Sequence, residues 1–202
     1  MLEGLNAALL AAADQPWVLL ALFAFCVLDG FFPPVPSESL VVGLAVISVS
    51  AGAPDLWLLI LVAAAGAAIG DNIAYQIGRT VGTRRFRWMR TRKAEAAFAR
   101  ADELLATRGA VIIITGRHIP LGRVAISMGA GATAMHRPTF VFLTIISGLV
   151  WAGLAVGVGV LAGHWLGHNP LLGIVVAILA AMAIGLVVDR LMAWWSARTP
   201  VV

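Results

Sequence analysis

Charged residues are scarce in this chain. Of its 202 residues 12% are charged and 61% are hydrophobic, whereas soluble domains carry roughly 25% charged residues. Residues 139–163 have no charge over 25 positions, and residues 171–188 have none over 18. About 20 apolar residues span a bilayer as a helix. The composition therefore excludes an ordinary soluble domain and predicts an all-α polytopic membrane protein.

Other features are missing as well. The single cysteine, Cys26, excludes an internal disulfide and a cysteine-based zinc site. The first 16 residues contain no Lys or Arg, so a cleavable signal peptide, which starts with a basic region, is not expected. No Ser-His-Asp set, HExxH motif or glycine-rich nucleotide loop occurs. We therefore predict no enzyme activity, no metal and no cofactor.

The basic residues that are present gather in one segment. Nine of the fourteen Lys and Arg residues lie in residues 79–108. Basic loops of membrane proteins stay in the cytoplasm and are attracted to anionic lipids. We expect this segment to be cytoplasmic, to include a surface helix over residues 93–106, and to contact anionic lipid rather than nucleic acid.

Two apolar segments are interrupted by charges and helix breakers. In the first, Asp29-Gly30 and the prolines of residues 33–36 separate two apolar runs that are each short for a span. In the second, residues 110–134, Pro120 lies among charged residues. Irregular backbone at membrane depth must be covered by protein or water. We therefore predict re-entrant hairpins at about 17–52 and 110–134, with a full crossing by residues 17–32 left open as the alternative.

Three further segments read as full spans, over residues 55–78, 139–163 and 171–188. The first contains Gly66 and Gly70, whose spacing lets another helix approach closely. With residues 79–108 in the cytoplasm, this topology places the acidic N-terminus outside and the C-terminus inside.

The order of elements repeats after 85 residues. Gly78 falls on Gly163, and Glu38 falls on Arg123. Because each unit crosses the membrane an odd number of times, the two copies are expected to be inverted. Inverted repeats with discontinuous segments are typical of secondary transporters, whose site lies between the repeats near the midplane. The predicted architecture is one domain: an inverted repeat of hairpin plus span, followed by a C-terminal span.

Charges inside the apolar segments are the candidate site residues, because burying them in a membrane is costly. Arg117 and Arg123 flank a Pro-Leu-Gly break, and guanidinium groups bind phosphate oxygens bidentately. Glu38, expected opposite Arg123, and Asp71 are candidate proton carriers. Accessory positions are Ser37 (read as a helix N-cap), His118 and Asn72.

These residues lie in motifs that together resemble the DedA family, also called the SNARE-associated or VTT-domain superfamily. The matching pieces are FPPVPSESLVVGLA at 32–45, GDNIAYQIGRTVG at 70–82, GRHIPLGRVAISMGAG at 116–131 and LAGHWLG at 161–167. The resemblance implies a bacterial inner-membrane protein with two facing re-entrant hairpins, embedded acidic residues and an arginine pair.

By motif position, the resemblance assigns the acidic residue to Glu38 and the arginine pair to Arg117 and Arg123. Some members place a second acid about a dozen residues after the first, where this chain has Ser50, and Asp71 is taken in its place. Members of the family are linked to envelope homeostasis and to the proton-motive force. Some are implicated in flipping undecaprenyl phosphate, and eukaryotic relatives scramble phospholipids.

The leading hypothesis is therefore a proton-coupled transporter or flippase for a lipid phosphate such as undecaprenyl phosphate. An uncoupled phospholipid scramblase and a non-transporting membrane scaffold are the alternatives. A membrane phosphatase is disfavoured because no nucleophile is paired with a base. Whether the chain forms a homo-oligomer is left open.

Overall fold

The structure is a computed structural model that describes residues 15–32, 35–83, 85, 91–116, 120–165, 176 and 179. This part of the chain is all-helical and contains no strand. Its six helices are α2 (Pro16–Asp29), α3 (Ser37–Ala51), α4 (Leu56–Val81), α5 (Arg92–Gly116), α6 (Pro120–Ala132) and α7 (Arg137–Trp165). Apart from residues 176 and 179, the predicted C-terminal span at 171–188 lies outside the described residues.

The two longest helices are candidate membrane spans. α4 has 26 residues and α7 has 29, and both are apolar enough to cross a membrane. At 1.5 Å per residue they are roughly 39 and 44 Å long, more than the roughly 30 Å of a hydrocarbon core. They match the spans predicted at 55–78 and 139–163. Asp55 caps α4 by accepting a hydrogen bond from the Leu58 amide at 2.9 Å.

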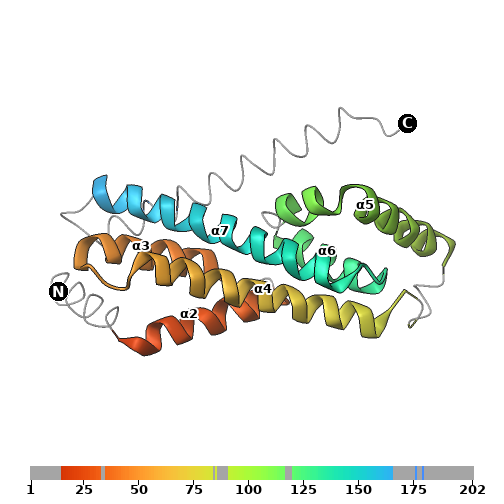
Figure 1. The fold of residues 1–202 in the computed structure, drawn as a ribbon, viewed down its shortest axis with the longest axis horizontal. Coiled ribbons are helices and arrows are strands. Elements are labelled where there is room, and N and C mark those ends of the chain that lie inside the picture. Colours follow the sequence, from red (N-terminus) through yellow and green to blue (C-terminus); the bar gives the residue numbers. More distant parts are fainter. Residues whose placement is uncertain are drawn as a thin grey trace.

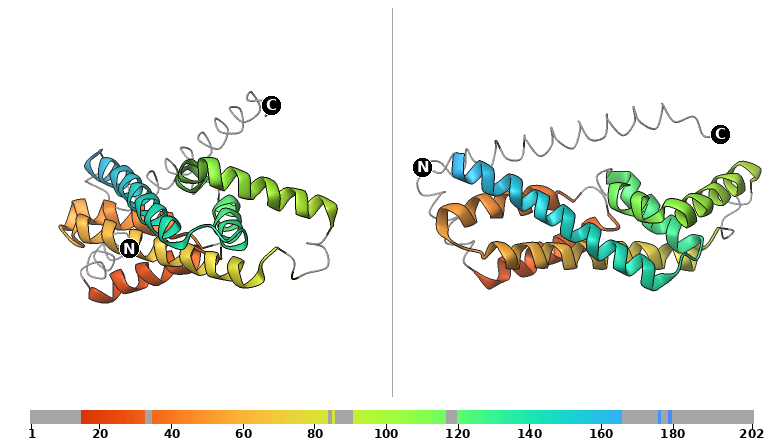
Figure 2. Two further views of the ribbon diagram at one scale, coloured as in Figure 1. Left: turned by 45° about the vertical axis from the view of Figure 1, so that its right-hand side comes forward. Right: turned by 45° about the horizontal axis from the view of Figure 1, so that its top comes forward.

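The shorter helices cover opposite halves of these two spans. Figure 1 shows α2 and α3 beside one half of α4 and α7, and α6 with the end of α5 beside the other half. α2 packs on α4, and α3 packs on α7. In both views of Figure 2 the end of α2 and the start of α3 lie toward the middle of the molecule.

Local sequence explains where these helices stop. α2 begins with a proline at its first position, where the missing amide costs nothing, and ends at Gly30. α3 ends at Gly52, which has a left-handed backbone with φ of 75°. α5 changes direction at Arg108, whose φ of −134° and ψ of 22° are not helical.

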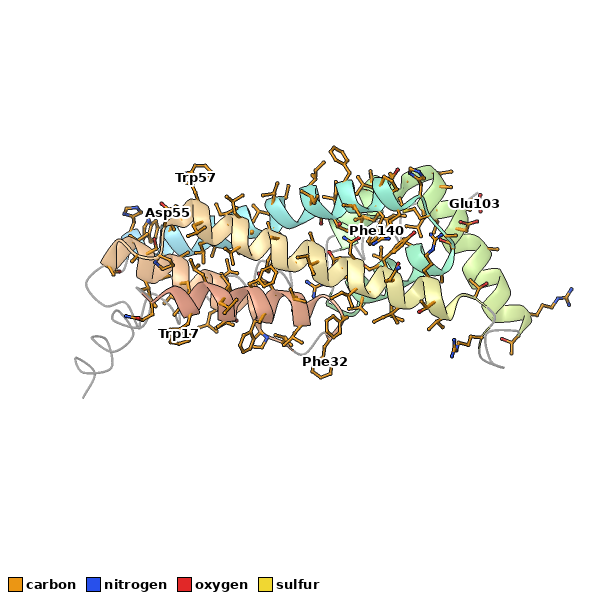
Figure 3. All side chains as sticks on the ribbon, turned by 60° about the horizontal axis from the view of Figure 1, so that its bottom comes forward. Trp17, Phe32, Asp55, Trp57, Glu103 and Phe140 are labelled. Atoms are coloured by element: carbon orange, nitrogen blue, oxygen red, sulfur yellow. The ribbon has the colours of Figure 1, made fainter. Side chains whose placement is uncertain are left out.

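The interior is packed with small side chains, and the bulky ones face outward. The main core cluster joins α2, α3, α4 and α7 through residues such as Val42, Ala45, Ala63 and Ala152. Trp57, by contrast, is 75% exposed, and Figure 3 shows Trp17, Phe32 and Trp57 pointing away from the bundle. Small residues inside and large apolar residues outside are the pattern of helices packed in lipid.

The predicted close approach at Gly66 and Gly70 is confirmed, with α2 as the partner helix. A Cβ at Gly66 would lie 2.8 Å from the Cβ of Cys26, and one at Gly70 would lie 2.8 Å from the Cα of Gly30. Neither position has room for a side chain. The contact brings the end of α2 directly against the middle of α4.

Candidate functional site

A buried arginine lies beside the end of α2 and the middle of α4. Arg123 is in the first turn of α6 and is 8% exposed. Its Nη2 lies 3.0 Å from Oδ1 of Asp29 and also donates a hydrogen bond to the Asp29 main-chain oxygen. Its Nε lies 3.8 Å from Oδ1 of Asp71. One guanidinium thus faces the carboxylates of two helices.

Asp29 is the last residue of α2 and is 9% exposed. Besides its contact with Arg123, its Oδ2 accepts a hydrogen bond from the hydroxyl of Ser37, the first residue of α3. A buried carboxylate is tolerated only when it is paired and hydrogen-bonded. Asp29 meets both conditions with partners from α3 and α6.

Asp71 is only 2% exposed and lies in the middle of α4. It reaches Arg123 because of the glycine contact described above, in which Gly30 follows Asp29 and Gly70 precedes Asp71. A Cβ at Gly30 would lie 2.8 Å from the Asp71 amide nitrogen. The two carboxylates are therefore brought together by backbones that touch.

We call Asp29, Ser37, Asp71 and Arg123 the Arg123 cluster. Its four members come from α2, α3, α4 and α6. Two carboxylates on different helices therefore share one guanidinium. The arrangement can hold an anion on Arg123 and protons on its acids.

The structure places Glu38 differently from the prediction. Its side chain is exposed, and the carboxylates within ion-pair distance of Arg123 are those of Asp29 and Asp71. Successive residues of a helix point about 100° apart, so Ser37 and Glu38 cannot both face the cluster. Ser37 faces it, and Asp29 takes the place expected for Glu38.

The reading of Ser37 as an N-cap is wrong. The N-cap of α3 is Pro36, which has no side chain to cap the helix, and Ser37 is the first helical residue. Its hydroxyl donates to Asp29 instead of accepting from the helix amides. The hydroxyl donates to Asp29 because a buried carboxylate that lacks hydrogen-bond donors is costly.

Asn72, predicted as an accessory position of the site, faces a different neighbour. Its Nδ2 donates to the Ala68 carbonyl at 2.8 Å and to Oγ1 of Thr144, on α7, at 3.2 Å. It therefore links the two long helices rather than joining the Arg123 cluster. Arg117 and His118 lie outside the described residues.

Asp29 is the member of the site that sequence reasoning missed. It was read only as part of a helix break, although it ends an uncharged run of apolar residues from Trp17 to Leu28. The criterion that selected Asp71 and Arg123, a charge inside an apolar segment, applies to it equally. In the described part of the chain no three His, Cys, Asp or Glu side chains lie together as a metal site would require.

Comparison with known proteins places the chain among membrane proteins. The VTT domain matches residues 35–161. An uncharacterized membrane protein of Mycobacterium leprae is 32% identical over 79% of this chain and 69% of its own length. One from Mycobacterium bovis is 29% identical over 87% and 84%. A Lactococcus lactis protein named alkaline phosphatase-like is 28% identical over 68% of each chain. No solved structure matches.

Proposed function

Because the chain belongs to the VTT-domain (DedA) family of membrane proteins, we propose that it is a transporter or flippase for a lipid phosphate of the undecaprenyl phosphate type, coupled to protons and supporting envelope homeostasis. The observation that carries the proposal is the Arg123 cluster. A buried guanidinium between two carboxylates is an expensive arrangement in a membrane and by default marks a functional site.

The packing of the helices supports an inverted repeat with two re-entrant hairpins. α4 packs on α2 and α6, and α7 packs on α3 and α5. Exchanging α2, α3 and α4 with the end of α5, α6 and α7 leaves this pattern unchanged. Gly78 of α4 lies against the Met128 carbonyl of α6, and Gly163 of α7 lies against the Val46 carbonyl of α3. These two glycines are the pair that the 85-residue shift superimposes.

The lengths of the short helices agree with re-entrant segments. α2 and α3 have 14 and 15 residues, or roughly 21 and 23 Å, so neither crosses a hydrocarbon core of roughly 30 Å alone. The alternative, a full crossing by residues 17–32, would need the helix to continue past Gly30, where α2 ends.

The cluster is suited to a phosphate. Ser37 begins α3, and Arg123 is in the first turn of α6, so two helix N-termini are directed at the same place. Helix N-termini favour anions. Arg123 also has a spare donor, because its Nε has no hydrogen-bond acceptor among the described residues. A headgroup phosphate would displace a carboxylate from the guanidinium, with Arg117 as the proposed second arginine and His118 as an accessory group.

This displacement would couple transport to protons. When phosphate takes the place of the carboxylates on Arg123, the proposal is that Asp29 and Asp71 take up protons as they leave the guanidinium. Release of the phosphate reverses the exchange. Glu38, exposed one residue after Ser37, would pass protons between water and the cluster. Asn72 is accessory in this scheme because it fixes α4 against α7.

We propose no enzyme activity. Ser37, the hydroxyl of the cluster, donates to a carboxylate that is itself paired with Arg123, and so is not set up as a nucleophile with a separate base. We also propose that the protein resides in a bacterial plasma membrane, with residues 79–108 and the C-terminus in the cytoplasm and the basic segment against anionic lipid.

The test is translocation of undecaprenyl phosphate by the full chain in liposomes. Arg123→Ala and Asp29→Asn should both reduce the rate to that of protein-free liposomes, and Glu38→Gln should reduce its dependence on a pH gradient. Glu103→Gln, which removes an exposed acid on α5, is the matched control and should leave the rate unchanged. Unchanged rates for Arg123→Ala and Asp29→Asn would refute the mechanism.

The same preparation separates the alternatives. An uncoupled scramblase would move lipid at one rate with and without the pH gradient. A scaffold would show no translocation above background, and Arg123→Lys would then change only the melting temperature.

A further inference from the structure

A cleft opens where α5 changes direction at Arg108. It lies between the two parts of α5, the turn at residues 133–136 and the start of α7, and its volume is about 750 Å³. Volumes of about 300–1,000 Å³ are usual for sites that take small molecules. The cleft does not include any member of the Arg123 cluster. We call it the α5–α7 groove.

Polar side chains line the groove beside the bend of α5 and before the apolar part of α7. They are Asp102, Thr107 and Arg108 from α5, and His136 and Thr139 from the turn and from α7. We call this part the polar end of the groove. His136 and Thr139 are linked through Nδ1 and Oγ1 at 3.2 Å. Arg108 is exposed, so its guanidinium is available to an anion at this end.

Further along α5 and α7 the lining of the groove is apolar, and we call this part its apolar end. Val111 and Phe142 line it and are 60% and 63% exposed. Leu143, which follows Phe142, also lines the groove and is buried. Exposed apolar side chains beside a buried one present a surface that hydrocarbon covers and water does not.

The position of α7 fixes how these two ends lie relative to a membrane. The helix is a candidate span that begins at Arg137, so the residues beside Arg137 lie at a membrane face. Phe142 is five residues further along, roughly 7.5 Å deeper. The polar end of the groove is therefore at headgroup level, and the apolar end is in the hydrocarbon.

We propose that the α5–α7 groove binds one anionic phospholipid from the surrounding bilayer, with its phosphate at Arg108 and an acyl chain over Leu143 between Val111 and Phe142. An extended peptide fits less well, because its backbone polar groups would lack partners at the apolar end. The inference narrows the proposed contact between the basic segment and anionic lipid to one site, and it depends on membrane embedding and not on transport.

The test is native mass spectrometry of the full chain titrated with phosphatidylglycerol or phosphatidylcholine. We expect one tightly bound phosphatidylglycerol and weaker binding of phosphatidylcholine. Arg108→Gln should weaken phosphatidylglycerol binding about fivefold, the effect of one basic residue near anionic lipid. Asp102→Asn should strengthen it, because Asp102 repels the phosphate from the same end of the groove.

Two variants test the location. Ala106→Trp places a large side chain in the groove from an exposed position and should abolish the tight binding. Ala65→Trp makes the same change at an exposed position of α4 outside the groove and should have no effect. Arg92→Gln, at the far end of α5, is the charge control for Arg108→Gln. Melting temperatures establish that each variant is folded.

Several outcomes would overturn the proposal. Equal affinity for the two phospholipids would remove the anionic preference. Equal weakening by Arg92→Gln and Arg108→Gln would reduce the effect to general surface charge. Preferential occupancy by undecaprenyl phosphate at equal concentration, lost in Ala106→Trp, would make the groove a substrate site and not a site for bilayer phospholipid.

Discussion

Tyr75 and Asp71 are buried polar residues of α4, one helical turn apart, and they make different kinds of contact. The hydroxyl of Tyr75 donates to the Met135 carbonyl at 2.6 Å and accepts from Arg79 Nη1 at 3.1 Å, and its ring stacks on Phe140 with centroids 4.6 Å apart. We call this group the Tyr75 anchor. Asp71, four residues earlier, faces Arg123 across 3.8 Å in an ion pair that Arg123 shares with Asp29.

The contrast separates a structural role from a functional one. In the Tyr75 anchor each polar atom has a partner at hydrogen-bond distance, and any rearrangement loses free energy. In the Arg123 cluster one guanidinium is divided between carboxylates on two helices, so more than one pairing is available at similar cost. We expect the anchor to govern stability and the cluster to govern transport, and each prediction below challenges that division.

The largest effect is expected at Arg123. Arg123→Met removes the cation that Asp29 and Asp71 share, and breaking such a buried pair costs about 3–5 kcal/mol, so both the melting temperature and lipid-phosphate translocation should collapse. Arg123→Lys keeps the charge but loses the planar fork. It should retain most of the stability and lose at least about tenfold in rate. If the Lys variant translocated lipid at the wild-type rate, the role of Arg123 would be structural, like that of the Tyr75 anchor.

The next effect is expected at Gly70, which holds the two carboxylates together. Gly70→Ala adds a Cβ that would lie 2.8 Å from the Cα of Gly30, and overpacking of this kind costs about 1–3 kcal/mol. Because α2 must move away, translocation should fall along with the melting temperature. Gly153→Ala is the control, since a Cβ there meets nothing within 4 Å. If Gly70→Ala lowered stability alone, the spacing of Asp29 and Asp71 would not matter to transport.

A purely structural loss is expected at Tyr75. Tyr75→Phe keeps the ring on Phe140 and removes the hydroxyl, which leaves the Met135 carbonyl without its donor and should cost about 1–3 kcal/mol. The translocation rate per folded molecule should not change. Thermal unfolding and a rate normalised to folded protein give the two readouts. A reduced normalised rate would show that the anchor also takes part in transport.

The smallest effect is expected at Asn72. Asn72→Ala removes its hydrogen bond to Thr144, and such bonds between membrane helices are worth about 0.6 kcal/mol on average. A slightly lower melting temperature with unchanged translocation would agree with a link between α4 and α7. A large loss of translocation rate at unchanged melting temperature would instead show that Asn72 takes part in transport.

The elements that could be predicted from the sequence depend on local properties. The spans now seen as α4 and α7 follow from the length of apolar runs, and the breaks follow from Asp29-Gly30, the prolines and the charges. The close approach at Gly70 follows from a spacing of four residues between small side chains. None of these inferences requires knowledge of how a helix is rotated.

To predict which acid lies beside Arg123, one must know how the helices are rotated about their axes. Ser37 and Glu38 are neighbours on α3, and neighbouring residues of a helix point about 100° apart. Which of them faces Arg123 depends on how α3 is rotated about its axis, which the sequence does not give. The packed structure shows that Ser37 faces inward and that Asp29 pairs with Arg123.

One contact of Arg123 has a mechanical consequence. Its bond to the main-chain oxygen of Asp29 goes to an atom that takes up no proton in water, unlike the carboxylates beside it. Arg123 is therefore joined to the end of α2 by the backbone as well as by a carboxylate. A substitution that removes the Asp29 carboxylate leaves this backbone link between α6 and α2 in place.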